Sequence, residues 1–310
     1  MANQIECFVL LRGGWKPTVE AFCATLDARY PALAPFTGEA GDPEAGLPYR
    51  LLVDGAEVTM TVVNAPYPPE QFYPPIRLTE TADVDALVEM QLAYVLLSAT
   101  APQMEPAPGE DDPAHEPPTT HVGGDPSVEL AEGYAAAVTL VASVVAAASP
   151  SLAAFWRASW RLVPCEVLHK AAERVMAGDP PRDLWVSTAE IRGQRAGGGD
   201  NLAMTTFGLR RFVGREVELS PAPVAKPAAE ALVRELVGKL LDGQAFEDRA
   251  SVVHPKMNES ATLRLADRFL RASQRAAVLV LPSSIHDAET LTPKRGAAKR
   301  GGFVNRLFGG

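Results

Sequence analysis

Residues 49–63 read YRLLVDGAEVTMTVV, two apolar, strand-like runs on either side of Asp54-Gly55. An Asp-Gly pair between such runs is the strongest short-range signal for a β-hairpin, because both central residues of the tight turn need positive φ. The sequence therefore predicts antiparallel strands over 49–53 and 57–63.

Further strands and helices are predicted on both sides of this hairpin. Residues 5–11 form a β-type apolar run, and a helical spacing of apolar residues follows from Pro17. A short helix over 83–90 and a strand over 92–99 complete the order β-α-β-β-α-β. This is the order of the split βαβ of a ferredoxin-like fold.

The second half repeats the same order after a long Ala-rich helix over 127–148. Its expected elements are strands 153–162, 184–191, 205–219 and 246–253 and helices 164–176 and 228–241. A further helix over 260–271 and a strand over 276–281 are expected after this repeat. The predicted fold class is α+β, with two tandem ferredoxin-like halves forming one compact unit. One larger mixed sheet with helices on both sides is the alternative.

The expected domains follow from the composition. Residues 1–102 form the first half, 103–126 an acidic Pro-rich flexible linker, 127–290 the connecting helix and second half, and 291–310 a basic flexible tail. Three cysteines without paired spacing indicate a reducing compartment, and the N-terminus lacks a secretory signal, so a cytoplasmic location is expected.

The charge and hydropathy argue against two classes of partner. The net charge of −9 becomes about −14 when the five basic residues of the tail are set aside, which disfavours nucleic-acid binding. The longest apolar stretch, 134–148, is shorter than the ~20 residues of a membrane span, so no transmembrane segment is expected.

Several motifs are similar to a bacterial family. They are VDGAEVTMTVVNAPYP, AEGYAAAVTLVASVVAAASPSLAAFWRASW, DLWVS, TTFGLRRFVGREVEL and LLDGQAFEDRASV. They resemble the proteins grouped as domain of unknown function 4261, over roughly residues 5–254 and most specifically over 184–219. The acidic insertion before the long helix departs from the family pattern. The resemblance implies a shared fold and supplies no activity, substrate or cofactor.

No catalytic, cofactor or metal-binding residues are predicted. Cys165 and His169 have the i, i+4 spacing of two ligands on a helix, but a buried cysteine beside a helix histidine explains them better. The chain has no GxSxG elbow. The glycine-rich loop 192–200 connects two expected strands and so lacks the helix that a phosphate-binding loop needs.

A tentative partner or ligand surface is predicted on two strands. Alternation places Arg157 and Arg161 on one face of 153–162, and Glu216 and Glu218 share a face of 205–219. If these strands are antiparallel neighbours, the side chains form cross-strand Arg–Glu pairs on an open face. A solvated face with ordinary ion pairs, or packing between the two halves, remains an alternative.

The basic tail supplies a second candidate contact. Phe303, Leu307 and Phe308 place three large apolar groups on about one helical turn, which could dock in a groove of a partner. The sequence thus favours a non-catalytic protein-binding or adaptor module without a cofactor. The alternative is an enzyme whose site lies in the cleft between the two halves.

Overall fold

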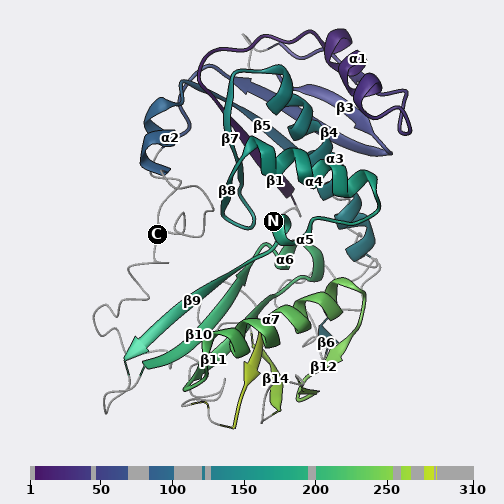
Figure 1. Cartoon of the computed structure of the whole chain (residues 1–310). Coiled ribbons are helices and arrows are strands. Elements are labelled where there is room, and N and C mark those ends of the chain that lie inside the picture. The colour runs from purple at the N-terminus through teal and green to yellow at the C-terminus, as the bar shows by residue number, and fades with distance from the viewer. Residues whose placement is uncertain are drawn as a thin grey trace, which may run out of the picture. The chain divides into compact units, whose positions relative to one another are not determined.

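The structure is a computed structural model, and its chain divides into two compact units (Figure 1). It describes residues 4–42, 47–68, 84–100, 121–122, 127–194, 200–253, 260–266, 276–282 and 284. The first unit comprises Met1–Gln103 and Glu129–Ser187, and the second comprises Met104–Val128 and Thr188–Gly310.

The first unit is built on a seven-stranded antiparallel sheet with the order β2-β3-β4-β5-β1-β7-β8. Its strands are β1 (Gln4–Leu11), β2 (Thr37–Glu39), β3 (Tyr49–Val53), β4 (Ala56–Val63), β5 (Ala93–Thr100), β7 (Ser151–Trp156) and β8 (Arg161–Pro164). The predicted hairpin is confirmed as β3–β4. Asp54 and Gly55 have φ values of 48° and 79°, as the tight turn requires.

Helices accompany this sheet, and in Figure 1 α3 and α4 lie in front of its strands. The helices are α1 (Val19–Arg29), α2 (Val84–Met90), α3 (Ser127–Ala148), α4 (Cys165–Met176) and α5 (Arg182–Trp185). Thr18 caps α1, since its Oγ1 accepts a hydrogen bond from the backbone N–H of Ala21 at 3.3 Å. The long helix is confirmed with its expected ends.

Helix α3 is long and apolar enough to cross a membrane by length and composition. However, 67% of its most apolar window is buried inside the protein, which is typical of the central helix of a soluble fold. It is the one such helix in the described part of the chain. Its burial agrees with the expectation of a core helix.

The expected single strand over 153–162 is wrong. The chain instead makes a hairpin, in which β7 and β8 pair and residues 157–160 turn. The turn contains no glycine or proline; Trp160 takes the positive φ of 54° that the turn needs, which is uncommon for a bulky residue. Because β7 also pairs with β1, this hairpin belongs to the first unit, whose second segment is Glu129–Ser187.

The mixed α+β class is confirmed, whereas the tandem ferredoxin-like arrangement is not. In a split βαβ, one strand lies between the two strands that the first helix connects. Here both β5 and β4 lie between β1 and β3. Two further strands, β7 and β8, extend the sheet beyond the expected four.

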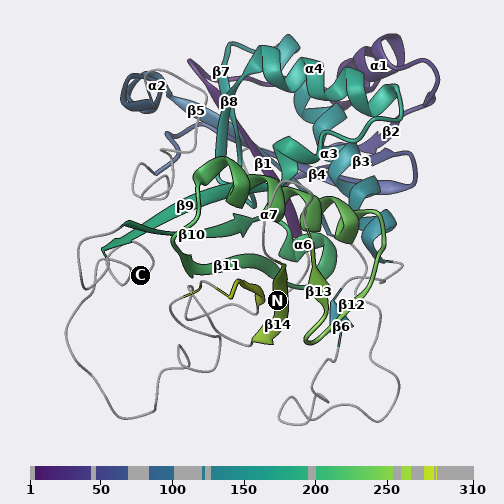
Figure 2. The ribbon, with the colours of Figure 1, turned by 60° about the horizontal axis from the view of Figure 1, so that its bottom comes forward.

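The second unit contains a six-stranded sheet with the order β13-β14-β15-β11-β10-β9 (Figure 2). Its strands are β9 (Ser187–Gln194), β10 (Asp200–Phe207), β11 (Glu216–Ala222), β13 (Ser251–Val252), β14 (Ala261–Ala266) and β15 (Ala276–Val280). Strands β11 and β15 are parallel. A separate ladder joins β6 (His121–Val122) to β12 (Phe246–Glu247).

The predicted helix over 228–241 is confirmed as α7 (Lys226–Leu241), which packs on β10 and β11. Its predicted apolar face is buried: Leu232, Val233, Leu236 and Leu240 have no exposed surface. A short helix, α6 (Arg210–Val213), lies between β10 and β11.

Four expected elements of the second half of the sequence differ from the structure. The strand over 205–219 is broken by α6, which ends at Gly214 with a φ of 75°. The helix over 260–271 begins as a strand, β14, because residues 261–266 (ATLRLA) alternate buried Leu263 with exposed Thr262. The strand expected over 184–191 begins at the end of α5, and β9 starts only at Ser187. The strand expected over 246–253 is divided into β12 and β13.

Candidate functional site

The residues of the predicted Arg–Glu surface belong to strands and turns of different units. Arg157 and Arg161 flank the turn between β7 and β8 in the first unit, whereas Glu216 and Glu218 lie on β11 in the second. Strand β7 pairs with β1 and β8, and β11 pairs with β10 and β15, so the expected cross-strand pairs do not form. The third set, Phe303, Leu307 and Phe308, lies outside the described residues.

A cluster of aromatic rings on one face of the first sheet is the most prominent feature near Arg157. The register sets Phe8 opposite Leu96 of β5 on one side and Phe155 of β7 on the other. We call this cluster the aromatic face; its rings belong to Phe8, Tyr67, Tyr94, Phe155 and Trp160. The Phe8 and Tyr67 ring centroids are 4.5 Å apart, and those of Phe155 and Trp160 are 6.2 Å apart.

Tyr67 is held on this face by a glutamine side chain. The backbone N–H of Tyr67 donates to Oε1 of Gln91 at 3.2 Å, and Nε2 of Gln91 donates to the carbonyl of Tyr67 at 2.8 Å. Gln91 is only 1% exposed, so its amide takes the place of a neighbouring strand for this residue. The Tyr67 ring then meets Tyr94 edge-on, with centroids 5.3 Å apart.

An ion pair lies beside these rings. Nη1 of Arg157 donates to Oε2 of Glu6 at 3.0 Å, and the backbone N–H of Arg157 donates to the carbonyl of Glu6 at 3.2 Å. The Arg157 side chain is 48% exposed and that of Glu6 only 14%. Burial raises the pKa of the Tyr67 hydroxyl, while Arg157 lowers it and Glu6 raises it. The ion pair is therefore close enough to Tyr67 to act on its charge.

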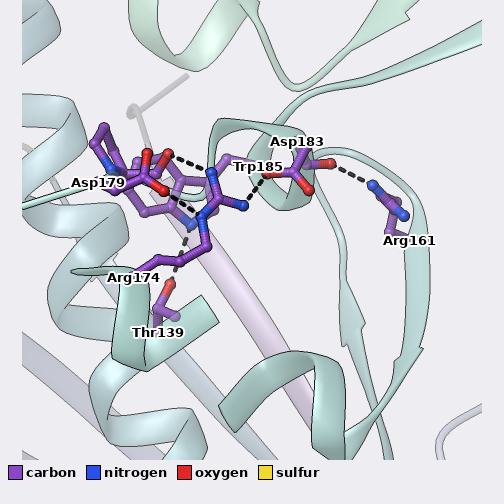
Figure 3. A network of polar contacts seen from close by, with 7 residues as sticks. Thr139, Arg161, Arg174, Asp179, Asp183 and Trp185 are labelled. Carbon is purple, nitrogen blue, oxygen red and sulfur yellow. Dashed lines mark hydrogen bonds and ion pairs between the residues drawn. The ribbon is translucent and has the colours of Figure 1, made fainter. Parts of the chain in front are cut away.

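Arg161, unlike Arg157, belongs to a polar network that holds the segment between α4 and β9 (Figure 3). Its Nη1 donates to the backbone carbonyl of Asp183. Arg174, in the last turn of α4, donates to Oδ2 of Asp179 at 2.7 Å and to Oδ1 of Asp183 at 2.6 Å. These hydrogen bonds to Asp179 and Asp183 raise the pKa of Arg174. Arg161 therefore serves the folding of this segment.

Glu216 and Glu218 were expected on an open face, and the structure buries both. Glu216 is 4% exposed and accepts hydrogen bonds from Oγ1 of Thr206 at 2.7 Å and from the backbone N–H of Gly208 at 3.1 Å. Glu218 is 1% exposed and accepts one from Oγ1 of Thr205 at 3.3 Å. Hydrogen bonds of this kind offset the desolvation of a buried carboxylate. Such a pair either specifies the packing of the sheet or performs acid–base chemistry.

Cys165 and His169 each have a local partner that explains them. The Cys165 thiol donates to Oγ of Ser151 at 3.3 Å, and burial raises its pKa, which keeps it a weak nucleophile. Nδ1 of His169 lies 2.8 Å from Oγ of Ser143 on α3. Within the described ranges, no three His, Cys, Asp or Glu side chains gather as a metal ion would require.

The environment of His169 favours its neutral form. Burial lowers the pKa of its imidazole first, and the positive charge of Arg29 lowers it further. Glu173 and Glu166 oppose this effect without reversing it. The hydrogen bond to Ser143 thus joins α3 to a neutral imidazole on α4.

The sequence interpretation missed the aromatic face. Phe8 and Tyr94 occupy alternate positions of strands that were predicted, and this alternation was the available signal. It does not show which face of the sheet a residue joins. Tyr67 lies in a proline-rich connection, where no periodicity could place its ring.

Comparison with known proteins does not assign the chain to a family. No family model, no curated protein and no solved structure matches it. The candidate site therefore depends on the geometry of the chain itself.

Proposed function

We propose that the protein is a non-catalytic protein-binding module, and that a segment of its partner docks on the aromatic face beside Arg157. The observation that carries this proposal is that the aromatic face, with its five rings, lies beside a half-exposed arginine of the β7–β8 turn. Trp160 and Arg157 come from the same turn, which holds both in fixed positions.

Arg157, Tyr94 and Trp160 of this surface are of the residue types found at energetic hot spots of protein interfaces. Such hot spots are enriched in tryptophan, tyrosine and arginine. The partly buried apolar side chains of the surface are Leu87, Tyr94, Leu96, Leu152 and Trp160. They pack against a buried base of Phe8, Leu10 and Phe155, so they are presented without much freedom to lose on binding.

A peptide-display selection on the full-length protein tests the proposal. We expect selected peptides to bind the wild type and to lose at least about tenfold in affinity on Leu96→Ala or Trp160→Asn. Asparagine tolerates the positive φ of position 160, so the second change removes the indole and retains the turn.

The matched control is Leu130→Ala, which removes a 45% exposed leucine from α3. Melting temperatures of all three variants check that the fold is retained. Peptides that bind the Leu96 and Trp160 variants as tightly as the wild type would contradict the proposal, and so would a selection that yields no binder.

The basic tail is a second contact in the same proposal. Its support is the spacing of Phe303, Leu307 and Phe308 behind a basic, glycine-rich spacer. Affinity capture with the full chain and with a chain ending at Asp287 tests this contact. A partner that binds both chains equally would exclude the tail.

Enzymatic activity is a second candidate function, favoured by the buried pair Glu216 and Glu218. A general acid or base at neutral pH needs a carboxyl pKa raised towards 6–7. Carbon-detected NMR titration of the glutamate side chains would measure this. Values below about 5 for both residues would exclude this candidate.

Family and location complete the proposal. The motifs that resemble domain of unknown function 4261 support membership of that bacterial family. The unpaired cysteines support a cytoplasmic location.

A further inference from the structure

Arg157 offers hydrogen-bond donors that the described part of the protein leaves unused. A guanidinium carries five N–H donors in a planar fork. Arg157 uses one of them, on Nη1, for Oε2 of Glu6. The structure shows no other hydrogen bond to this guanidinium from any residue that it describes, and the side chain is 48% exposed.

The position of this arginine is fixed in advance. Its backbone N–H continues the pairing of β7 with β1 by donating to Glu6, and its carbonyl accepts from the backbone N–H of Trp160 at 3.3 Å. The guanidinium therefore emerges from an ordered turn at the margin of the aromatic face. A ligand that binds there meets a charge whose backbone needs no reordering.

Glu6 is a carboxylate that already occupies part of the fork. Arg157 is half exposed to water and contacts Glu6 through a single N–H group, so a second carboxylate can bind the guanidinium beside Glu6. A carboxylate that engages two N–H groups together is a stronger partner than the single contact with Glu6.

The surroundings define the rest of the ligand. Trp160 and Leu96 offer partly exposed apolar surface, and Arg157 supplies a half-exposed positive charge. A segment that complements both the apolar surface and the positive charge has an acidic residue next to a large apolar one. A basic segment would instead bring like charges together at Arg157.

We propose that the partner segment recognised at the aromatic face carries a carboxylate flanked by apolar side chains, and that this carboxylate binds the guanidinium of Arg157. This inference rests on the proposed binding function. The net charge of −9 slows the approach of an acidic segment, so the affinity comes from these short-range contacts.

Two matched peptides test the inference, acetyl-Leu-Glu-Phe-amide and acetyl-Leu-Gln-Phe-amide. Each is titrated into the isotope-labelled full chain, and NMR shifts of the Leu96 methyls and the Trp160 indole give the affinity. We expect the glutamate peptide to bind at least about threefold more tightly than the glutamine peptide, since its hydrogen bonds to the guanidinium are charge-assisted.

Three variants locate the effect. Arg157→Gln should remove the difference between the peptides. Glu6→Gln should increase it, because the competing carboxylate is gone. Arg50→Gln removes an exposed arginine from β3 of the same sheet and should leave the difference unchanged. Melting temperatures establish that each variant is folded.

The outcomes separate this inference from the proposed function. Equal binding of the two peptides at Leu96 and Trp160 overturns the carboxylate preference and leaves the binding module intact. Shifts of the same resonances by short oligothymidylate, but not by the glutamate peptide, also overturn it. If neither peptide shifts them and the display selection yields no binder, both proposals fail.

Discussion

Replacing Thr139 with valine would leave the indole N–H of Trp185 without its acceptor inside the first unit. Nε1 of Trp185 donates to Oγ1 of Thr139 at 3.1 Å, and the two residues are 1% and 0% exposed (Figure 3). A buried donor that loses its partner costs about 1–3 kcal/mol. We expect Thr139→Val to lower the free energy of unfolding of this unit by that amount.

A double-mutant cycle separates this cost from other effects of the valine. In a Trp185→Phe background there is no N–H to leave unpaired, so the same Thr139→Val change should cost little. The hydroxyl of Thr139 also donates to the carbonyl of Ala135 at 2.7 Å, and that contribution is common to both backgrounds. We expect a coupling energy of about 1–2 kcal/mol between the two positions.

Tryptophan fluorescence during urea unfolding measures this cycle on the first unit alone. The four tryptophans of the chain, Trp15, Trp156, Trp160 and Trp185, all belong to that unit. Three of them remain in the phenylalanine background. A coupling energy below about 0.3 kcal/mol would mean that the indole hydrogen bond does not stabilise the unit, which would refute the reasoning.

Tyr30→Phe should leave the first unit unchanged or up to about 1 kcal/mol more stable in the same assay, because the buried Tyr30 hydroxyl has no hydrogen-bond partner within the described ranges. Burial and Arg29 lower the pKa of His169, so below its ordinary pKa of 6.5 the unfolded chain gains a proton before the folded one does. The urea concentration at the unfolding midpoint should therefore decrease as the pH is lowered from 7 to 5, and His169→Gln should make this decrease smaller. Glu216→Ala removes the acceptor of the Thr206 O–H and of the Gly208 backbone N–H and should cost about 2 kcal/mol or more, seen as faster hydrogen exchange in β10 and β11. Gly55→Ala, at a φ of 79°, should cost about 1 kcal/mol in thermal unfolding; an unchanged melting temperature would contradict the positive φ.

The elements that the sequence predicted have local causes. The β3–β4 hairpin is specified by Asp54-Gly55, whose residues adopt positive φ at low cost. Helices α3 and α7 follow from long apolar patterns that a strand cannot bury on one side. Each of these signals lies within the element itself, and so a single sequence is sufficient to find it.

The neighbours of the strands have no such local signal. Strand β7 pairs with β1, about 145 residues earlier in the chain, and nothing within residues 151–156 specifies that partner. The hairpin β7–β8 was missed for a related reason. Its turn depends on Trp160 in a conformation that bulky residues seldom adopt, so the run was interpreted as one continuous strand. The expected Arg–Glu surface required both the continuous strand and the wrong neighbour.

The two candidate sites show what an alternating pattern can establish. Alternation predicted that Glu216 and Glu218 share a face of a strand, but it could not show that both side chains are buried, because the threonines that stabilise the buried carboxylates come from β10. The same limit applies to Arg157, which alternation placed on one face with Arg161. Phe155 is fully buried, whereas the arginine two positions later is half exposed. A strand that passes from core to solvent within two residues brings an apolar base and an accessible charge together. That combination, which comes from the end of β7 rather than from its alternation, makes this turn the strongest binding candidate in the described chain.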